Sequence, residues 1–330
     1  MKFKVTILCC VFAFAKAEFS KSQSNDLGNV LTDLLLISDR YVQPAAEASV
    51  MQSSAGWYQS ASSLDKYKIT VALHANALVF PSGKKNFDIN NDELLNLTIR
   101  GDESTTIPTT LGGEQRTFFD FTIDGDLYEF QAFEGIDTGF LAYPFLQVGV
   151  GLWQETELLL RYSPNIKIDK SDYAIYGIGV KHNLSQYLFK GERPVELAFL
   201  TSYSLFDLNL SFNPYELRSD DNSPPLAVID GSLVDAHAVL FQLIGSKDYN
   251  DWTFSSGVAY NRSWIDYELS GDDGIFLQTL NDVLSILSET QHSYKVDLGA
   301  TYHFNNWDLS SQLSAGDFIN LNIGGIYHLN

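Results

Sequence analysis

The stretch Ile319-Asn320-Leu321-Asn322-Ile323-Gly324-Gly325-Ile326-Tyr327-His328-Leu329 decides the fold. Apolar side chains occupy almost every second position, and the positions between them hold mostly Asn, Gly or His. A period of two is typical of a β-strand with one apolar face and one polar face. The stretch is long enough to cross a bilayer, which takes about 9–11 tilted residues per strand.

The same alternation recurs along most of the chain, and it predicts about 12–14 strands, many of them longer than the usual strand of about 5–6 residues. Residues 117–134 are predicted to form a hairpin that turns at Asp124-Gly125, because Asp-Gly favours a tight turn. The clearest other segments are 69–79, 146–152, 158–162, 174–181, 195–204, 236–240, 252–261, 294–304 and 307–313.

Two folds contain such strands: a soluble sandwich, and an outer-membrane barrel whose apolar faces point to lipid and whose polar faces point to the lumen. The barrel is favoured because the strands are long and because their polar faces carry Asn, Ser, Gln and Gly more than Lys and Glu. Aromatic residues near strand ends match the two interfacial girdles of a membrane barrel. These residues are Tyr143, Trp153, Tyr162, Tyr173, Trp252, Tyr294, Phe304, Trp307 and Tyr327.

Composition excludes several classes of protein. The chain has 330 residues, 45 % of them hydrophobic and only 19 % charged, which is too apolar for a disordered chain. Lys and Arg number 21 against 41 Asp and Glu, for a net charge of −20, so a nucleic-acid partner is not expected. No stretch after the N-terminus is apolar enough for a transmembrane helix.

Residues 1–17 are predicted to be a secretory signal peptide. A basic start at Met1–Lys4 precedes an apolar run over Val5–Phe14, and Ala15-Lys16-Ala17 offers small residues for cleavage before Glu18. Cleavage would remove both cysteines and three lysines, which gives a mature chain with no Cys and a net charge of −23. Such an exported chain cannot rely on disulfides, which favours a large core or a closed sheet.

Residues 18–66 differ from the rest, and we expect them to form a plug, or hatch, before a barrel over residues 67–330. Leucines at helical spacing predict an amphipathic helix over about 25–40, which Pro44 should end. A helix packed beneath the barrel is the alternative. The candidate ligand or plug residues are Tyr41, Pro44, Gly56, Trp57 and Tyr58. Long extracellular loops are expected at 81–113, 213–229 and 270–291, with a short helix near 277–287.

Five ionisable side chains fall on strand faces predicted to line the lumen: His74, Arg161, Lys181, His237 and His303. A polar lumen accounts for them without further assumption. No catalytic residue, cofactor or metal site is predicted, because the chain lacks phosphate-loop, zinc-protease and serine-hydrolase motifs. Asp220-Asp221 and Asp272-Asp273 leave divalent cations at acidic loops as a weaker expectation, since they form no complete Ca²⁺ loop.

Several short motifs resemble a family of uncharacterised Bacteroidota outer-membrane proteins. The motifs are Tyr41-Val42-Gln43-Pro44, Gly56-Trp57-Tyr58-Gln59-Ser60-Ala61, Ile107-Pro108-Thr109, the run 144–151, Arg161-Tyr162-Ser163-Pro164, and Tyr176-Gly177-Ile178-Gly179-Val180-Lys181-His182 followed by Ser185-Gln186-Tyr187. The resemblance implies an architecture like that of the FadL class of hydrophobic-compound transporters, a barrel with an N-terminal hatch. It carries over no ligand site and no activity, since fold does not fix function.

We therefore expect an exported barrel in the outer membrane of a Gram-negative bacterium of the Bacteroidota, surrounded by outer-membrane lipids. The first functional hypothesis is a plug-gated channel for small hydrophobic compounds. The alternative is a non-conducting structural or surface-interaction barrel with acidic extracellular loops. An apolar pocket or a lateral gap in the wall would favour the first hypothesis, and a lumen packed with polar side chains would favour the second.

Overall fold

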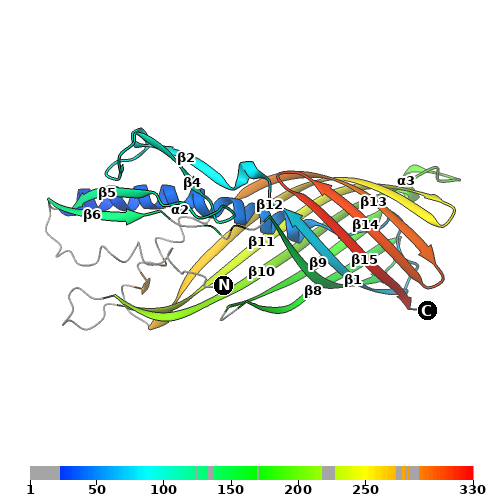
Figure 1. Ribbon diagram of the computed structural model, residues 1–330. Coiled ribbons are helices and arrows are strands. Elements are labelled where there is room, and N and C mark those ends of the chain that lie inside the picture. The colour runs from blue at the N-terminus through cyan, green and yellow to red at the C-terminus, as the bar shows by residue number, and fades with distance from the viewer. Residues whose placement is uncertain are drawn as a thin grey trace.

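The computed structural model describes residues 23–123, 125–132, 135, 137, 139–168, 171–217, 227–272, 277–278, 281 and 290–329. Within these residues, ten antiparallel strands form one closed barrel (Figure 1). They are β1 (Ile69–Val79), β7 (Phe140–Gly151), β8 (Thr156–Ile168), β9 (Ser171–Asn183), β10 (Glu196–Leu217), β11 (Ala227–Tyr249), β12 (Trp252–Asp272), β13 (Gln291–Phe304), β14 (Trp307–Ala315) and β15 (Ile319–Leu329).

Strand β1 closes the barrel by pairing with both β15 and β7. Ile69 lies opposite Leu329 on one side and opposite Val150 on the other. The predicted barrel fold is confirmed, but the described barrel has ten strands and not 12–14. Two facts account for the difference. Five short strands lie outside the barrel, and β10, β11 and β12 are each 21–23 residues long, so fewer strands use up more of the chain.

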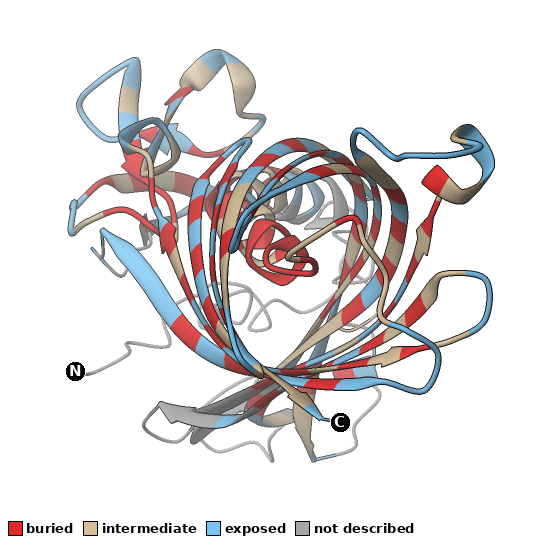
Figure 2. Cartoon of the chain, turned by 90° about the vertical axis from the view of Figure 1, so that its right-hand side faces the viewer, coloured by how far each residue is buried: buried red, intermediate tan, exposed pale blue. Residues whose placement is uncertain are grey.

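The alternation separates two environments across the wall. Along β1 the residues are exposed and buried in turn, and the same pattern holds for β14 and β15 (Figure 2). Large apolar side chains are exposed on the outer face, such as Leu73 (60 %), Val258 (56 %) and Leu298 (60 %). Polar side chains such as Asn76, Gln242 and Asn322 are buried on the inner face. The outer face is therefore apolar and the inner face holds most of the buried polar side chains of the wall, as in membrane barrels.

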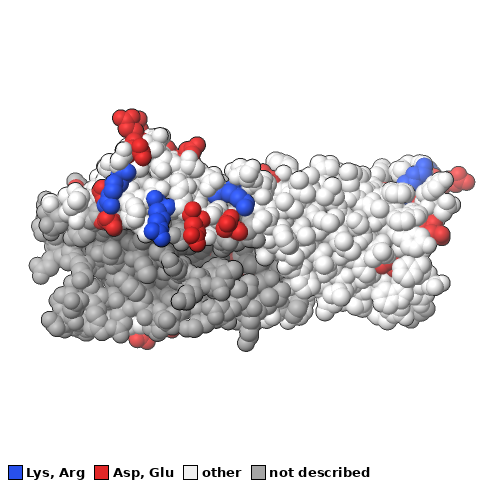
Figure 3. All heavy atoms as spheres, in the orientation of Figure 1, with Lys and Arg blue, Asp and Glu red and all other residues white. Residues whose placement is uncertain are grey.

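The two mouths of the barrel differ. At one, here the short-turn mouth, strands connect through 152–155, through 184–195 with the short helix α3 (Ser185–Leu188), and through 250–251 and 305–306. At the other, the long-loop mouth, residues 80–139 connect β1 to β7. Figure 3 shows a broad part of the wall between the two ends without charged side chains.

An N-terminal helix, α2 (Gln23–Ser54), runs from beyond the long-loop mouth into the lumen (Figures 1 and 2). Beyond that mouth the helix packs against two small sheets. We call residues 26–42 of the helix, together with residues 80–132, the outer unit. These sheets pair β2 (Asn86–Asn90) with β4 (Ser104–Pro108), and β3 (Thr98–Ile99) with β5 (Phe118–Ile123) and β6 (Asp126–Gln131). The outer unit also holds the 3-10 turns η1 (Ser82–Lys84) and η2 (Asn91–Glu93). No described helix is long and apolar enough to cross a membrane.

The outer unit has its own core and its own polar anchor. Val30, Leu34, Ile37 and Tyr41 of α2 pack against buried side chains from 89–132, including Phe119. The buried carboxylate of Asp33 accepts the backbone N–H groups of Leu95, Asn96 and Leu97 at 2.8, 2.7 and 2.9 Å. Three charge-assisted hydrogen bonds to one helix residue hold the segment before β3 against α2.

Two expectations for this part of the chain were wrong. Pro44 does not end the helix, because residues 45–54 pack inside the barrel mouth against Leu78, Ala236 and Phe318. The carbonyl of Tyr41, at the turn that Pro44 disturbs, accepts hydrogen bonds from the Thr110 N–H and hydroxyl at 3.0 and 2.6 Å. Residues 81–113 are not a plain loop either, since they form β2, β3 and β4.

The other predicted loop segments lie partly outside the described residues. Strands β10, β11 and β12 extend into the ranges 213–229 and 270–291 that were expected to be loops, and residues 218–226, 273–276, 279–280 and 282–289 lie outside the description. The helix expected near 277–287 is described only at 277, 278 and 281. The hairpin predicted around Gly125 is confirmed as β5–β6, with Gly125 at φ +90°.

Candidate functional site

The candidate site is the contact between the end of α2 and the inner face of the barrel. The last four carbonyls of any helix lack partners within it. Here the barrel wall supplies hydrogen-bond donors for two of these carbonyls, those of Gln52 and Ser53. The Gln52 carbonyl accepts from the Tyr143 hydroxyl at 2.7 Å and from the Asn76 amide at 3.3 Å. Tyr143 and Asn76 belong to β7 and β1, so two neighbouring strands hold one turn of the helix.

Arg161 makes the strongest of these contacts. It is 3 % exposed, and its Nη1 donates to the carbonyls of Ser53 and Ala55 at 3.0 and 2.9 Å. The guanidinium also donates to Gln147 Oε1, through Nη2 at 2.9 Å. A cation at a helix C-terminus is favourable because the carbonyls there carry partial negative charge. This arginine therefore neutralises and anchors the inner end of α2.

Gly56 and Trp57 turn the chain away from the helix end. Gly56 has φ +71°, the left-handed conformation that commonly follows a helix, and its N–H donates to Gln312 Oε1 at 2.9 Å. Trp57 Nε1 donates back to the Ser53 carbonyl at 2.9 Å. The Trp57 ring lies against Gly177 and Gly179, where an added Cβ would come within 2.8 and 3.0 Å of its atoms. The two glycines on β9 make room for this ring.

Below Trp57, residues 58–63 continue through the lumen toward the short-turn mouth. Lys181 Nζ donates to the Ser60 carbonyl at 3.1 Å, and it pairs with Glu157 at 2.8 Å. The Ala61 N–H donates to Ser246 Oγ at 3.0 Å. A second buried pair joins Lys295 and Asp297 at 2.6 Å. Buried pairs of this kind are costly to break, because loss of one partner leaves an uncompensated charge.

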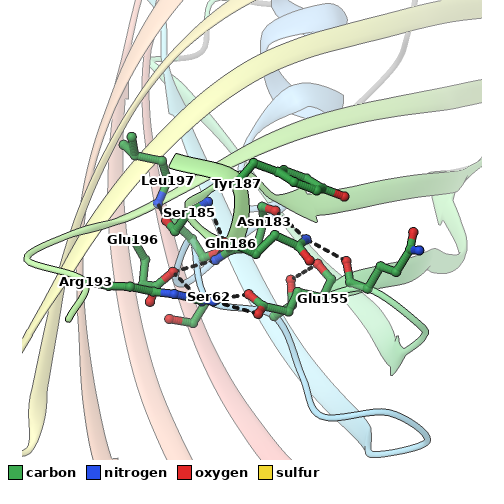
Figure 4. A network of polar contacts seen from close by, with 12 residues as sticks. Ser62, Glu155, Asn183, Ser185, Gln186, Tyr187, Arg193, Glu196 and Leu197 are labelled. Carbon is green, nitrogen blue, oxygen red and sulfur yellow. Dashed lines mark hydrogen bonds and ion pairs between the residues drawn. The ribbon is translucent and has the colours of Figure 1, made fainter. Parts of the chain in front are cut away.

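At the short-turn mouth a further network fixes the segment where it leaves the barrel (Figure 4). Asn183 Nδ2 donates to the Ala61 carbonyl at 3.1 Å and to Glu196 Oε2 at 2.6 Å. Ser63 Oγ donates to the Glu155 carbonyl at 2.6 Å. The Arg193 guanidinium, 2.8 Å from each Glu155 oxygen, holds the pKa of that carboxyl below its usual range. The end of β9 and the connection 152–155 thus hold the emerging chain, and Arg193 of the connection 184–195 holds Glu155 in turn.

The residues singled out as ligand or plug candidates fall in two places. Gly56, Trp57 and Tyr58 lie inside the barrel, where Trp57 and Tyr58 are buried among Leu159, Leu200 and Leu240. Tyr41 and Pro44 lie toward the outer unit, away from that site. Burial there raises the pKa of the Tyr41 phenol to about 12.

Four of the five ionisable side chains expected in the lumen lie on the inner face. His74 hydrogen-bonds to Asn322 at 3.0 Å and stacks on Phe145. Arg161 and Lys181 donate to the carbonyls of Ser53 and Ser60, in the segment inside the barrel, residues 52–63, that is called the plug from here on. His303 lies near the short-turn mouth, where Asp308 bridges it to His328 at 2.7 and 2.6 Å.

His237 does not lie in the lumen, and its predicted placement was wrong. Its neighbours Ala236 and Ala238 point inward, because small side chains there make room for Ala46 of α2. The imidazole lies on the outer face, where it stacks on Trp264 with ring centres 5.1 Å apart.

Sequence reasoning missed Tyr143, Gln147, Asn183 and Gln312 as partners of the plug. The alternation predicts that Gln147, Asn183 and Gln312 face inward, but nothing in the sequence told which inward residues meet residues 52–61. Tyr143 was expected in the aromatic girdle, and that placement was wrong, because its side chain is buried inside the barrel and its hydroxyl donates to the Gln52 carbonyl.

One cavity of about 310 Å³ lies at the short-turn mouth and is lined by Ser63, Leu64, Asp65, Lys68, Ile69, His328 and Leu329. In the described part of the chain, no three His, Cys, Asp or Glu residues are grouped to hold a metal ion. The site can therefore hold the plug, and its chemistry is that of hydrogen bonding and charge pairing.

A closed antiparallel barrel with an apolar outer face and many buried polar side chains on its inner face defines the class: an outer-membrane β-barrel fold. The chain belongs to a family of unknown function (DUF6588), whose pattern matches residues 1–329. No curated protein matches it.

Solved structures similar to the chain include the outer-membrane protease OmpT of Escherichia coli, at 11 % identity and TM-score 0.34, covering 79 % of this chain and 97 % of that one. The translocator domain of the autotransporter NalP from Neisseria meningitidis matches at 11 % identity and TM-score 0.36, covering 88 % and 99 %. A FadL homologue from Pseudomonas aeruginosa matches at 12 % identity and TM-score 0.26, covering 76 % and 60 %. These similarities concern the fold alone.

Proposed function

We propose that the protein is a closed, non-conducting barrel of a Gram-negative outer membrane that displays the outer unit at the cell surface. The observation that carries the proposal is the anchoring of the plug from Gln52 to Ala61 by side chains of the barrel wall. An open channel would require these contacts to break together with the burial of Trp57, which is 1 % exposed. Display of the outer unit requires neither the loss of these contacts nor the exposure of Trp57.

The lengths of the connections at the two mouths indicate how the barrel is oriented in the membrane. In outer-membrane barrels the short turns face the periplasm and the long connections face outward. The long-loop mouth carries the outer unit, which therefore lies outside the cell, and residues 1–17 act as the cleaved signal that exports the chain. Charged side chains of the outer unit form pairs such as Arg40–Glu93 and Arg100–Glu129. Figure 3 shows charged side chains gathered at one end of the molecule, away from the uncharged part of the wall. An exposed, folded unit with its own core is suited to contact a partner outside the cell.

Conductance of the mature chain in planar bilayers tests the closed barrel. The wild-type protein is expected to show no steady conductance, even though protease added on the outer-unit side cleaves that unit and so proves insertion. The matched variant Arg161→Ala removes the anchor of the helix end, and it is expected to show intermittent conductance. A steady open channel in the wild-type protein contradicts the proposal.

A second function, passage of small hydrophobic compounds, is favoured by one irregularity in the wall. Pairing between β7 and β8 covers only Leu146–Gly151 and Glu157–Tyr162, although β7 begins at Phe140 and β8 runs on to Ile168. Proline occupies positions 144 and 164 beside this unpaired stretch and supplies no N–H for a ladder. Directly behind it, Tyr143, Phe145 and Ile175 form an apolar cluster with Phe206 inside the barrel.

Binding of a fluorescent long-chain fatty acid tests this second function. Ile175→Asn places an amide in the apolar cluster, and it should weaken binding at least about tenfold if compounds enter there. Ile265→Asn makes the same change at another inward position, beside Ala46 and Ala236, and it should leave binding unchanged. Equal binding by both variants, or no binding by the wild-type chain, rules passage through this stretch out.

A further inference from the structure

On the outer face of β12, the charged residue Arg262 follows a row of apolar and aromatic side chains. Counting from the short-turn mouth, the outward side chains Trp252, Phe254 and Val258 are 43, 53 and 56 % exposed. Tyr260 follows, and then Arg262, which is exposed. On the neighbouring β13 the order is the same, with exposed Leu298 and Val296 leading to Tyr294 and His292. Arg262 and His292 face each other across the two strands.

Aromatic and imidazole rings frame this arginine. The Tyr260 hydroxyl and His292 Nδ1 are 2.6 Å apart, and the two rings stack at 14°. When the phenol donates to Nδ1, the neutral imidazole carries its proton on Nε2, which leaves that N–H as a donor. On the other side of Arg262 along β12, Trp264 stacks on His237. Rings of this kind sit at the level of lipid headgroups, where one edge is apolar and the other is wet.

Arg262 differs from three other arginines at the surface in its partners, and it shares the lack of an ion pair only with Arg116 of the outer unit among the exposed arginines that the structure describes. Arg40, Arg100 and Arg193 each pair with a carboxylate. Arg262 has no ion pair among the described residues, although the chain carries 41 acidic residues against 21 basic ones. The nearest acidic residue along the same face, Asp266, lies 3.3 Å from His237 instead. A long cationic side chain beside an apolar surface, with no protein counterion, calls for a counterion from outside the protein.

We propose that Arg262, together with His292 and Tyr260, binds the phosphate group of an anionic lipid in the outer leaflet. Arginine donates two parallel hydrogen bonds to one phosphate, and the imidazole and phenol beside it offer further polar contacts. The exposed apolar side chains toward Val258 and Leu298 cover the acyl chains of the same lipid. The proposal rests on the outer-membrane location proposed above.

Native mass spectrometry of the full mature chain in a maltoside detergent, which carries no phosphate, tests the site. The probe is lipid A, a diphosphorylated glycolipid, compared with the same lipid after its phosphates are removed. Wild-type protein should retain lipid A, and Arg262→Gln should weaken retention about tenfold, the loss expected for one charge-assisted contact. The control Lys247→Gln removes an exposed cation near the short-turn mouth on β11, and it should bind like the wild-type protein.

Each alternative result has a defined meaning. Equal retention by Arg262→Gln and the wild-type chain, or equal retention of the dephosphorylated lipid, overturns the site. Displacement of lipid A by equimolar inorganic phosphate would show a free-anion site, and it would also overturn a lipid site. Failure of the membrane location itself would show separately, because the wild-type chain would then remain monodisperse after the detergent is removed.

Discussion

The guanidinium carbon of Arg161 lies 4.0 Å from the centre of the Trp57 ring. The same carbon is 4.0 Å from the centre of the Phe145 ring, so the cation lies close to one ring of the plug and one ring of the wall. Contacts of this kind are strongest when they are desolvated, and Arg161 is almost fully buried. The barrel and the plug are therefore joined at this point by packing, by charge and by hydrogen bonds to two helix carbonyls.

Replacing this arginine should loosen the plug without opening the sheet. Arg161→Met keeps much of the side-chain volume but leaves the Ala55 carbonyl without its donor, which should lower the free energy of unfolding by about 1–3 kcal/mol. Urea unfolding of the barrel in detergent measures this change. Hydrogen exchange of residues 55–58 should rise at the same time, because the turn they form depends on Arg161.

The matched control is Arg193→Met at the short-turn mouth. Arg193 forms a partly exposed pair with Glu155, and such pairs contribute at most about 1 kcal/mol. Exchange at residues 55–58 should stay at the wild-type level in this variant. Equal effects of the two substitutions would show that Arg161 does not anchor the plug.

The packing of Trp57 against β9 predicts a steric effect. Gly177→Ala places a methyl group 2.8 Å from a Trp57 ring carbon, in a wall that cannot easily move, and it should destabilise the barrel by about 1–3 kcal/mol. Gly245→Ala, where the nearest atom is 3.6 Å away, should change stability little. Thermal unfolding followed by near-ultraviolet circular dichroism distinguishes the two. Adding Trp57→Leu should restore much of the loss in Gly177→Ala, and failure to do so contradicts the proposed contact.

The outer unit should lose stability in acid before the barrel does. Hydrogen bonds from Arg40 hold the pKa of the Glu93 carboxyl below its usual range, and those from Arg100 do the same for Asp120. A carboxyl whose pKa is lower in the folded state stabilises the fold above its unfolded pKa. That contribution is lost as the pH falls through the folded value, here below about pH 4. Limited proteolysis of residues 86–131 should therefore speed up on acidification from neutral pH.

A charge-free variant checks the cause of this pH dependence. Glu93→Gln removes one of the two groups, so cleavage near η2 should already be faster at neutral pH and should change less on acidification. The exposed positions of these groups keep the expected effect small. Unchanged cleavage of the wild-type outer unit across this pH range would contradict the prediction.

The barrel could be predicted because polar and apolar residues alternate regularly along most of its strands. Wherever polar and apolar residues alternate, as along β1 and β15, parity alone predicts which side chains face inward. On β11 the pattern misleads, because Ala236 and Ala238 are apolar yet face the plug, so His237 was assigned to the wrong face. An inward alanine that packs on a helix looks the same in sequence as an outward alanine that meets lipid.

Local sequence patterns could not predict the fold of the outer unit or the contacts between the plug and the wall. Pro44 normally ends a helix, and only the surrounding barrel mouth and Thr110 allow α2 to continue past it. The strands β2–β4 are two to five residues long, which is too short for a periodic signal. Pairing of Arg161 with residues 53 and 55 joins positions more than a hundred residues apart, and one sequence holds no record of such contacts.

The course of the chain through the lumen predicts where the start of α2 lies in a cell. The helix begins in the outer unit, passes the long-loop mouth, and residues 55–66 reach β1 at the opposite mouth (Figure 1). Gly28 is exposed with no atom within 4 Å of an added Cβ. Both cysteines of the chain lie within residues 1–17, the signal peptide proposed above, so Gly28→Cys would carry the only thiol of a chain cleaved as proposed. A membrane-impermeant maleimide should label this variant on intact cells. Asp251→Cys, at the exposed β11–β12 turn, should be labelled only after the outer membrane is permeabilised. Labelling of Asp251→Cys but not Gly28→Cys on intact cells would reverse the proposed orientation, and labelling of neither would place the whole barrel away from the cell surface.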